Sequence, residues 1–296
     1  MPSWSELQPF IPIGLALGGV YALSGVGMVV LYRATGVLNL ASGAVGAMGA
    51  LIAWMLINSD GVPRGIGYAV CVLFGGVSTL VYGVVFGPVL AARDPLVKAV
   101  ATLGLALILL GLMSWIWSDL ARSMSLPTDN SAFAVGQANV NWTQVIGLGF
   151  AILVTISTGL FLRLTKIGTA MRALANDREI TATLGVPVRR VEAAAWFGSG
   201  LISGAAGLLL ADLVALDAAT LTFLVIFTVS AALIARLRSI TLTFVAAIVI
   251  GLVEALITPI QAISQYQNMT PFVLAVAALL FFSRNRQFSF ARGGIR

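Results

Sequence analysis

Long apolar runs fill most of the chain, and short polar stretches separate them. A helix needs roughly 20 apolar residues to cross a hydrocarbon core about 30 Å thick, and nine runs approach or exceed that length. They cover 8–31, 35–57, 66–91, 97–118, 142–163, 191–211, 219–235, 240–258 and 270–283. The last run is the shortest, so eight crossings are the alternative. The pattern predicts an all-α polytopic membrane protein with a single transmembrane domain over residues 1–296.

The composition supports this class. The chain is 59% hydrophobic and 9% charged, with a mean hydropathy of +1.01, values far from those of soluble proteins. Its net charge of +6 does not indicate a nucleic-acid surface, because the basic residues lie at the ends of the apolar runs.

The distribution of Lys and Arg predicts the orientation. With nine crossings, 15 of the 17 Lys and Arg lie on one side of the membrane, and only Arg64 and Arg122 lie on the other. The basic side comprises, with their flanks, the loops 32–34, 92–98, 163–190, 236–239 and 284–296. Cytoplasmic loops carry an excess of Lys and Arg. The C-terminus and the 163–190 loop are therefore expected in the cytoplasm and the N-terminus outside.

Small residues recur at helical spacing in three of the runs. Gly14 and Gly18 in the first run are spaced for close helix contact. The second run carries Gly43, Gly46 and Gly49, which indicate either close packing or a local helix break that lines a cavity. A third small-residue face, interpreted as a packing surface, comprises Ser199, Gly200, Ser203, Gly204 and Gly207.

The loop 163–190 is the longest segment rich in charge. The chain has 17 basic and 11 acidic side chains, and eight of these charged side chains lie in this loop. Asn176 and Glu179 fit a capping box that would start a helix over 177–184. Gly185 would end this helix in the left-handed conformation, with Pro187 just beyond. A preceding helix is expected to carry Ile167, Met171 and Leu174 on one face. Since such short helices are not stable alone in water, they must pack against something.

Outside the loop 163–190, the sequence gives few candidates for a catalytic or metal-binding site. The segment 119–141, with Asp119, Arg122, Pro127, Asp129 and Asn130, is expected to be an irregular exposed loop. The chain has no His, and Cys71 is the only Cys, so no His-based catalysis, disulfide or thiolate metal site is expected within it. Neither Lys98 nor Lys166 follows a Gly, which excludes a Walker A phosphate loop. We expect no enzyme activity, no metal site and no cofactor bound by this chain.

Glu254 is the clearest ionisable residue inside an apolar run. A carboxylate at that position must be paired, protonated or hydrated, which makes Glu254 a candidate for substrate or proton handling. A hydrated structural role near the outer interface is the alternative. An ion-coupled secondary transporter that uses Glu254 is a second functional class to be kept open.

Two segments resemble a known family. The opening GLALGGVYALSGVGMVVLYRATGVLNLASGAVGAMGA and the loop TKIGTAMRALANDREITATLGVPVRRV are similar, in sequence and order, to LivH-type inner-membrane permeases of branched-chain amino acid ABC importers. The resemblance spans nearly the whole chain. Residues 39–43 read Asn-Leu-Ala-Ser-Gly, whereas many members of the family have Phe after the Asn and His before the Gly.

The resemblance implies that residues 172–186 form a cytoplasmic coupling helix that docks on a separate ATPase. It implies polar rim contacts and a docking surface made by Arg172, Leu174, Asp177, Arg178, Glu179, Ile180, Leu184 and Gly185. The implied partners are a second permease subunit, two ATPases that bind ATP-Mg, and an extracytoplasmic solute-binding protein. Branched-chain or other small neutral amino acids would pass along Asn39, Ser42 and Glu254. Urea, short amides or other small organic solutes are the alternative substrates.

Overall fold

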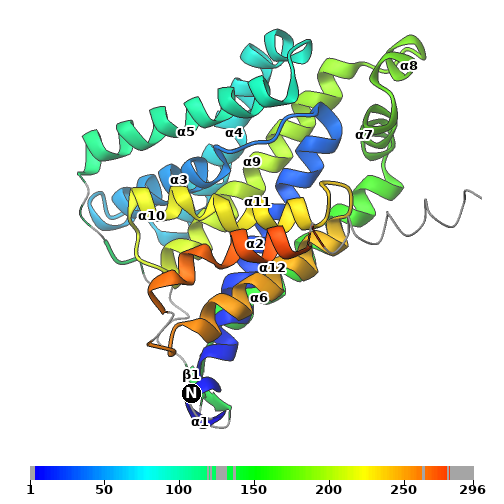
Figure 1. Cartoon of the computed structure of the whole chain (residues 1–296). Coiled ribbons are helices and arrows are strands. Elements are labelled where there is room, and N and C mark those ends of the chain that lie inside the picture. The colour runs from blue at the N-terminus through cyan, green and yellow to red at the C-terminus, as the bar shows by residue number, and fades with distance from the viewer. Residues whose placement is uncertain are drawn as a thin grey trace, which may run out of the picture.

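The computed structural model describes residues 4–118, 120, 122–124, 132–135, 138–261, 264–278 and 280. Nearly all of them are helical (Figure 1). The helices are α1 (Trp4–Leu7), α2 (Phe10–Thr35), α3 (Ser42–Asn58), α4 (Arg64–Ala91), α5 (Pro95–Trp117), α6 (Trp142–Leu164), α7 (Lys166–Asn176), α8 (Arg178–Thr183), α9 (Val188–Leu213), α10 (Ala218–Phe223), α11 (Val225–Ile234) and α12 (Ile240–Ile257). A 3-10 helix, η1 (Ser264–Met269), follows.

Six of these helices are long and apolar enough to cross a membrane, namely α2, α4, α5, α6, α9 and α12. Two shorter apolar stretches, Ser42–Asn58 and Ala218–Ile234, lie where the sequence predicts further crossings. The last predicted segment, 270–283, is helical at 270–278 and 280, and its other residues lie outside the described part of the chain. The prediction of an all-α polytopic membrane protein is confirmed.

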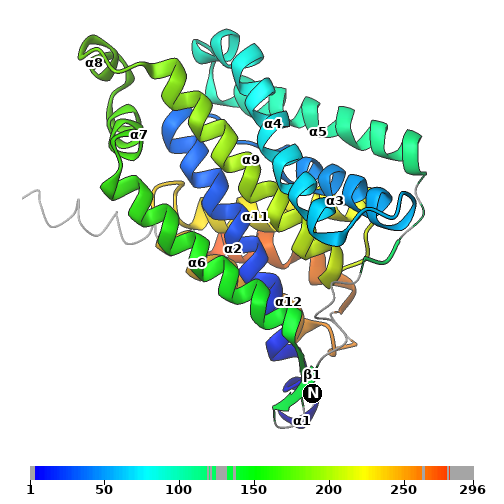
Figure 2. The same ribbon diagram turned by 180° about the vertical axis from the view of Figure 1, so that it is seen from behind.

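Helix α2 runs through the centre of the bundle (Figure 2). It packs along α12, α9 and α6, and most of its residues are buried. A Cβ atom on Gly14 would lie 2.9 Å from the carbonyl oxygen of Gly251, and one on Gly18 would lie 2.8 Å from the Cα of Ile248. The absence of side chains therefore lets the α2 and α12 backbones touch. The close helix contact predicted from Gly14 and Gly18 is confirmed.

Helices α4 and α9 form a second close pair, on the other side of α2. A Cβ on Gly200 would overlap with Thr79 and the carbonyl group of Gly75, and one on Gly204 would lie 2.7 Å from the carbonyl oxygen of Cys71. Cys71 is buried, and its thiol donates to the Gly204 carbonyl at 3.3 Å. The small-residue face of α9 is thus a packing surface, as its sequence predicts.

Helix α3 begins at Ser42, whereas the hydropathy pattern predicts a helix from residue 35. Helix α2 ends at Thr35 and is capped by Gly36, which has φ +70°, and residues 36–41 are not helical. Two backbone N–H groups of this break are hydrogen-bonded to side chains inside the protein. The Leu40 N–H donates to the Thr102 hydroxyl at 3.1 Å, and the Ala41 N–H donates to Asn39 Oδ1 at 3.0 Å.

The glycines of α3 follow directly after this break. A Cβ on Gly46 would lie 2.7 Å from the Ser203 carbonyl oxygen on α9, and one on Gly49 would lie 2.9 Å from the Cys71 carbonyl oxygen on α4. Close packing therefore explains this strip, and the local break lies at its start.

The predicted helix 219–235 is also interrupted. It consists of α10 and α11 with Leu224 between them. Asp217 caps α10, because its Oδ2 accepts from the Thr220 N–H at 2.8 Å. The chain turns back after α11 through Arg236 and Leu237, which have φ +54° and +55°. The helix of one apolar segment therefore begins later than predicted, after a non-helical stretch, and that of the other is irregular at Leu224.

The prediction that 119–141 is irregular is wrong for its second half. Strands β1 (Ala132–Val135) and β2 (Ala138–Asn141) form an antiparallel hairpin in which Ala132 faces Asn141. Arg122 exchanges two backbone hydrogen bonds with Leu216, and its guanidinium carbon lies 4.9 Å from the ring centroid of Trp54. The remaining residues named in this segment lie outside the described part of the chain, namely Asp119, Pro127, Asp129 and Asn130.

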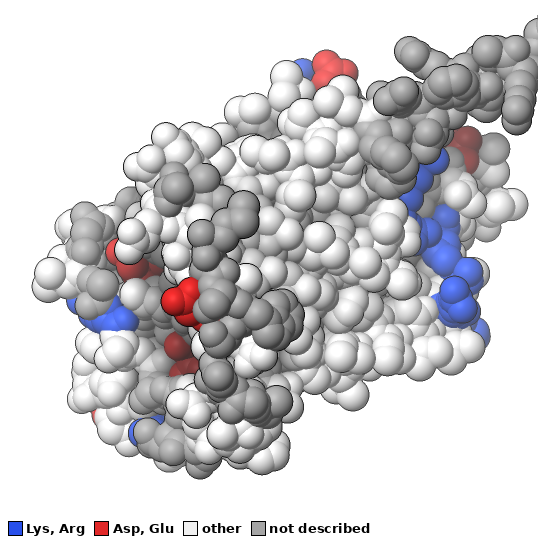
Figure 3. Space-filling view, turned by 60° about the horizontal axis from the view of Figure 1, so that its bottom comes forward, with Lys and Arg blue, Asp and Glu red and all other residues white. Residues whose placement is uncertain are grey.

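Charges separate along the bundle. In the space-filling view, Lys and Arg gather at the right-hand end, and most of the Asp and Glu in view lie toward the left (Figure 3). The basic end carries α7 and α8. The basic C-terminal segment 284–296 lies outside the described residues.

Candidate functional site

The polar loop between α6 and α9 forms two short helices, α7 and α8, at the basic end. The predicted capping box at Asn176 and Glu179 is wrong, because Asn176 is the last residue of α7. Asp177 has the extended backbone of an N-cap, with φ −153° and ψ +115°, and its Oδ1 accepts from the Ile180 N–H at 2.9 Å. Helix α8 thus starts one residue later than predicted. Gly185 has φ +81°, so its predicted left-handed conformation is confirmed.

Helix α7 anchors this unit to the bundle. Met171 and Leu174 are 3% and 6% exposed and pack with Leu162 and Val191, the latter on α9. Ile167, predicted on the same face, is 45% exposed instead. Leu174, expected among the docking residues, therefore packs beneath the surface.

Helix α8 projects from the bundle beyond α7 (Figures 1 and 2). Its Arg178 forms an ion pair of 3.0 Å with Glu192 on α9. Ile180 is 60% exposed and Leu184 76% exposed, whereas Thr181 is buried. Asp177 and Glu179 are also exposed, so α8 presents two apolar side chains within a polar rim. Such a surface is typical of a protein docking site.

A second candidate site lies where the two discontinuous segments meet. Gly43, in the first turn of α3, packs directly against the backbone of Leu221 and Thr222 in α10. Asn39 and Ser42 are buried beside this contact, and the Ser42 hydroxyl donates to the Asn39 carbonyl at 3.2 Å. Asn39 Nδ2 and Thr222 Oγ1 are both buried without a hydrogen-bond partner in the structure. Solute sites in transporters are commonly built at interruptions in membrane helices, and buried polar groups with free hydrogen-bonding capacity could bind a solute there.

Thr222 and Thr102 are site residues that the sequence did not reveal. Thr222 lies in the apolar run 219–235, and nothing in that run marks the break at Leu224. Thr102 supports the other break from α5, more than 60 positions from Leu40. Neither residue stands out in a hydropathy pattern.

Glu254, the third residue expected on the solute path, lies on another helix. It is in the last turn of α12, where its side chain interacts with the hydroxyl of Tyr21 on α2. Glu254 Oε2 is buried without a hydrogen-bond partner. Among the described residues no hydrogen bond joins Glu254 to Asn39 or Ser42. Whether these three residues line one path stays a prediction.

Within the described residues, no group of His, Cys, Asp and Glu could hold a metal ion. Asn39, Ser42 and Thr222 together are called the polar centre. It offers amide and hydroxyl groups, which can hydrogen-bond a neutral or zwitterionic solute. Together, the six long apolar helices and the shorter apolar helices packed among them define the class of a multi-pass membrane protein.

Comparison with known proteins places the chain more closely. It belongs to the family of permease components of the branched-chain amino acid transport system, and the sequence model of this family matches residues 10–282. It is therefore a transport subunit of the cell membrane and not an enzyme.

Curated relatives cover most of the chain. A probable branched-chain amino acid transport permease protein LivH from Methanocaldococcus jannaschii is 25% identical over 87% of this chain and 85% of its own length. The high-affinity permease protein LivH of Escherichia coli K12 is 25% identical over 90% of this chain and 91% of its own length. The high-affinity permease protein BraD of Pseudomonas aeruginosa has the same identity and coverage.

Proposed function

We propose that the chain is a permease subunit of an ATP-driven importer. The observation that carries this proposal is α8, a short capped helix that stands out from the basic end with Ile180 and Leu184 exposed. A separate ATPase that docks there would cover these side chains. Since the chain lacks a Walker A loop, ATP-Mg binds to the partner.

The assembly that fits this function contains a second permease subunit, two ATPases and an extracytoplasmic solute-binding protein. The chain crosses the membrane nine times, with the N-terminus outside and the basic end in the cytoplasm. The separation of charge along the bundle supports this orientation. Docking residues would then be Arg178, Glu179, Ile180, Leu184 and Gly185, with Arg172, Leu174 and Asp177 holding α7 and α8 in place.

The solute class is a branched-chain or other small neutral amino acid. The names of the relatives support this class, and the polar centre suits it. Asn39, Ser42 and Thr222 supply neutral hydrogen-bonding groups in the interior, and two of them have polar atoms without a partner in the structure. Glu254, near the opposite end from α8, would contact the solute at the outer part of the path. Urea and short amides would make similar hydrogen bonds, so a transport assay must include them.

Isolation of the chain from its native membrane in mild detergent tests the importer proposal. We expect a homologous permease and two P-loop ATPases to co-purify, and uptake of leucine into reconstituted vesicles to require ATP and the binding protein. Recovery of the chain alone, with uptake driven by an imposed proton gradient, would instead establish a secondary transporter.

Thr222→Val tests the polar centre. Valine has nearly the same shape, so the substitution removes a hydroxyl without a cavity. If that hydroxyl binds the solute, the half-saturating concentration for solute passage should rise about fivefold, the effect of losing a hydrogen bond of roughly 1 kcal/mol. The measurement is ATP-driven uptake at a range of concentrations of binding protein loaded with solute.

Thr243→Val is the matched control. Thr243 is fully buried, but its hydroxyl donates to the Ser239 carbonyl within α12 at 2.8 Å. We expect unchanged concentration dependence. Equal behaviour of the two variants would remove Thr222 from the solute path.

A further inference from the structure

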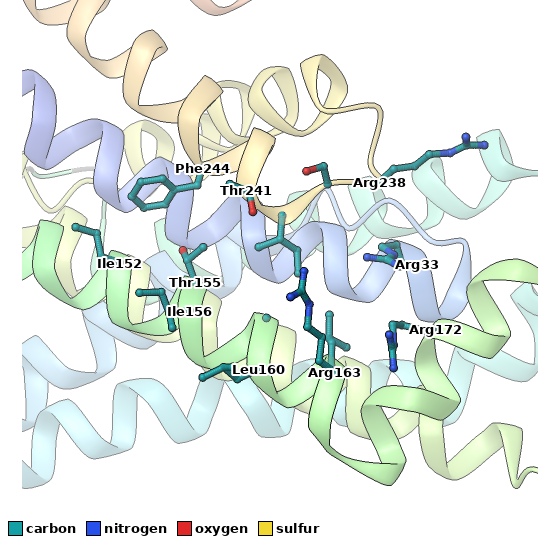
Figure 4. Close-up of a pocket in the computed structure, with 14 residues that line it drawn as sticks. Arg33, Ile152, Thr155, Ile156, Leu160, Arg163, Arg172, Arg238, Thr241 and Phe244 are labelled. Carbon is teal, nitrogen blue, oxygen red and sulfur yellow. The ribbon is translucent and has the colours of Figure 1, made fainter.

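A cleft of about 650 Å³ opens between α6 and α12 toward the basic end of the bundle. Both helices pack on α2 but barely contact each other, so α2 forms the floor of the cleft. Its lining residues come from α2, α6, α7 and α12 and from the turn before α12 (Figure 4). Neither the docking surface of α8 nor the polar centre accounts for this cleft.

Four arginines, Arg33, Arg163, Arg172 and Arg238, line one end of the cleft, and the side chain of Arg238 extends away from the other three (Figure 4). No Asp or Glu lines it among the described residues. The described salt bridge at this end of the bundle joins Arg178 to Glu192, away from the cleft. Arg172 Nε is buried and has no hydrogen-bond partner. Four guanidinium groups without a carboxylate repel one another, so an anion would stabilise them.

The rest of the cleft is apolar. Ile152, Ile156 and Leu160 form one wall on α6, and their side chains are exposed. Phe244 on α12 faces them across the gap (Figure 4). A soluble anion such as inorganic phosphate would use the arginines and leave this wall uncovered. The combination of a cationic end and an apolar wall fits a molecule with an anionic head and a hydrocarbon tail.

We propose that this cleft binds an anionic phospholipid of the membrane leaflet at the basic end. Guanidinium groups bind phosphate through paired N–H donors, which suits a headgroup phosphate held between Arg163 and Arg172. Arg33 and Arg238 complete the site, and an acyl chain lies along Ile156 and Phe244. The lipid thereby joins α7 to the start of α12.

The test compares lipids on the purified chain, together with any subunits that co-purify. The probes are phosphatidylglycerol, phosphatidylcholine of the same acyl chains, and inorganic phosphate. Native mass spectrometry and the thermal midpoint report binding. We expect phosphatidylglycerol to remain bound and to raise the midpoint by several degrees, with little effect of the other two.

The double variant Arg163→Gln with Arg238→Gln should lose at least about tenfold in affinity for phosphatidylglycerol, because two charge-assisted contacts are removed. The control, Arg93→Gln with Arg189→Gln, removes the same charge outside the cleft and should bind as the unaltered chain does. If the double variant does not fold, Arg163→Gln alone serves, with an expected loss of about threefold.

Three results would overturn the proposal. Equal stabilisation by phosphatidylcholine would mean that the cleft does not select an anionic head, and equal stabilisation by phosphate would mean a site for a free anion. Loss of phosphatidylglycerol binding in the presence of co-purified subunits, but not in the isolated chain, would assign the cleft to a protein contact.

Discussion

Ile180→Asp combined with Leu184→Asp is expected to abolish ATP-driven uptake while leaving the permease folded in the membrane. Both side chains are exposed, and neither contributes to the buried clusters of the bundle. Burying each against a partner contributes roughly 1.5–3 kcal/mol, so the pair accounts for a factor of on the order of 10²–10⁴ in affinity for the ATPase. Two carboxylates in the same contact add a desolvation cost. The measurements are co-purification of the ATPase and ATP-driven uptake.

Ile180→Val combined with Leu184→Met is the matched control, because it keeps both side chains apolar. It should retain the ATPase and most of the uptake. Wild-type uptake by the Asp pair would mean that α8 is not the surface on which ATP hydrolysis acts.

Gly200→Val is expected to have the second large effect, a loss of stability of more than about 3 kcal/mol. A Cβ at Gly200 would overlap with Thr79 and with the backbone of Gly75 on α4. Because a backbone cannot move aside as a flexible side chain does, α4 and α9 must separate. The thermal midpoint of the detergent-solubilised protein and its amount in the membrane measure the effect.

Gly198→Val provides the comparison within the same helix. Gly198 is two residues away on α9, and a Cβ there would meet no atom within 4 Å. The helix propensity changes equally in both variants, so only packing differs between them. A midpoint for Gly200→Val equal to that of Gly198→Val would contradict the close contact of α4 and α9.

Hydropathy predicted the helices well where a single apolar run forms a single helix. The run 142–163 is α6, Trp142–Leu164, and the run 240–258 is α12, Ile240–Ile257. The hydropathy pattern could not predict the breaks at 36–41 and Leu224, because both lie among apolar residues. The bonds that stabilise the first break come from Thr102, which is distant in sequence.

Capping residues and Gly185 predicted a short helix in the polar loop between α6 and α9, but the predicted start of this helix was one residue too early. Asn176 and Asp177 are both good N-cap residues, and the choice between them depends on where α7 ends. The packing of Met171 and Leu174 on the bundle extends α7 through Asn176, so the cap falls on Asp177.

The candidate sites depend on contacts between distant segments. Asn39 and Ser42 could be named from the sequence, whereas Thr222 required the packing of α3 against α10. The arginines of the cleft are spread from Arg33 to Arg238, so no local pattern groups them. Glu254 was recognisable by its charge, but its position beside Tyr21 of α2 follows only from the fold.

The glycine contacts of α2 with α12 and of α4 with α9 have a mechanical consequence. Where two backbones touch, a helix cannot rotate or slide against its neighbour without steric overlap. Each pair is therefore expected to move as a rigid unit. Helix α8 is tied to α9 by the ion pair of Arg178 with Glu192, 3.0 Å apart. A displacement of α8 would therefore act on α4 and α9 together, because the backbones of these two helices are in direct contact.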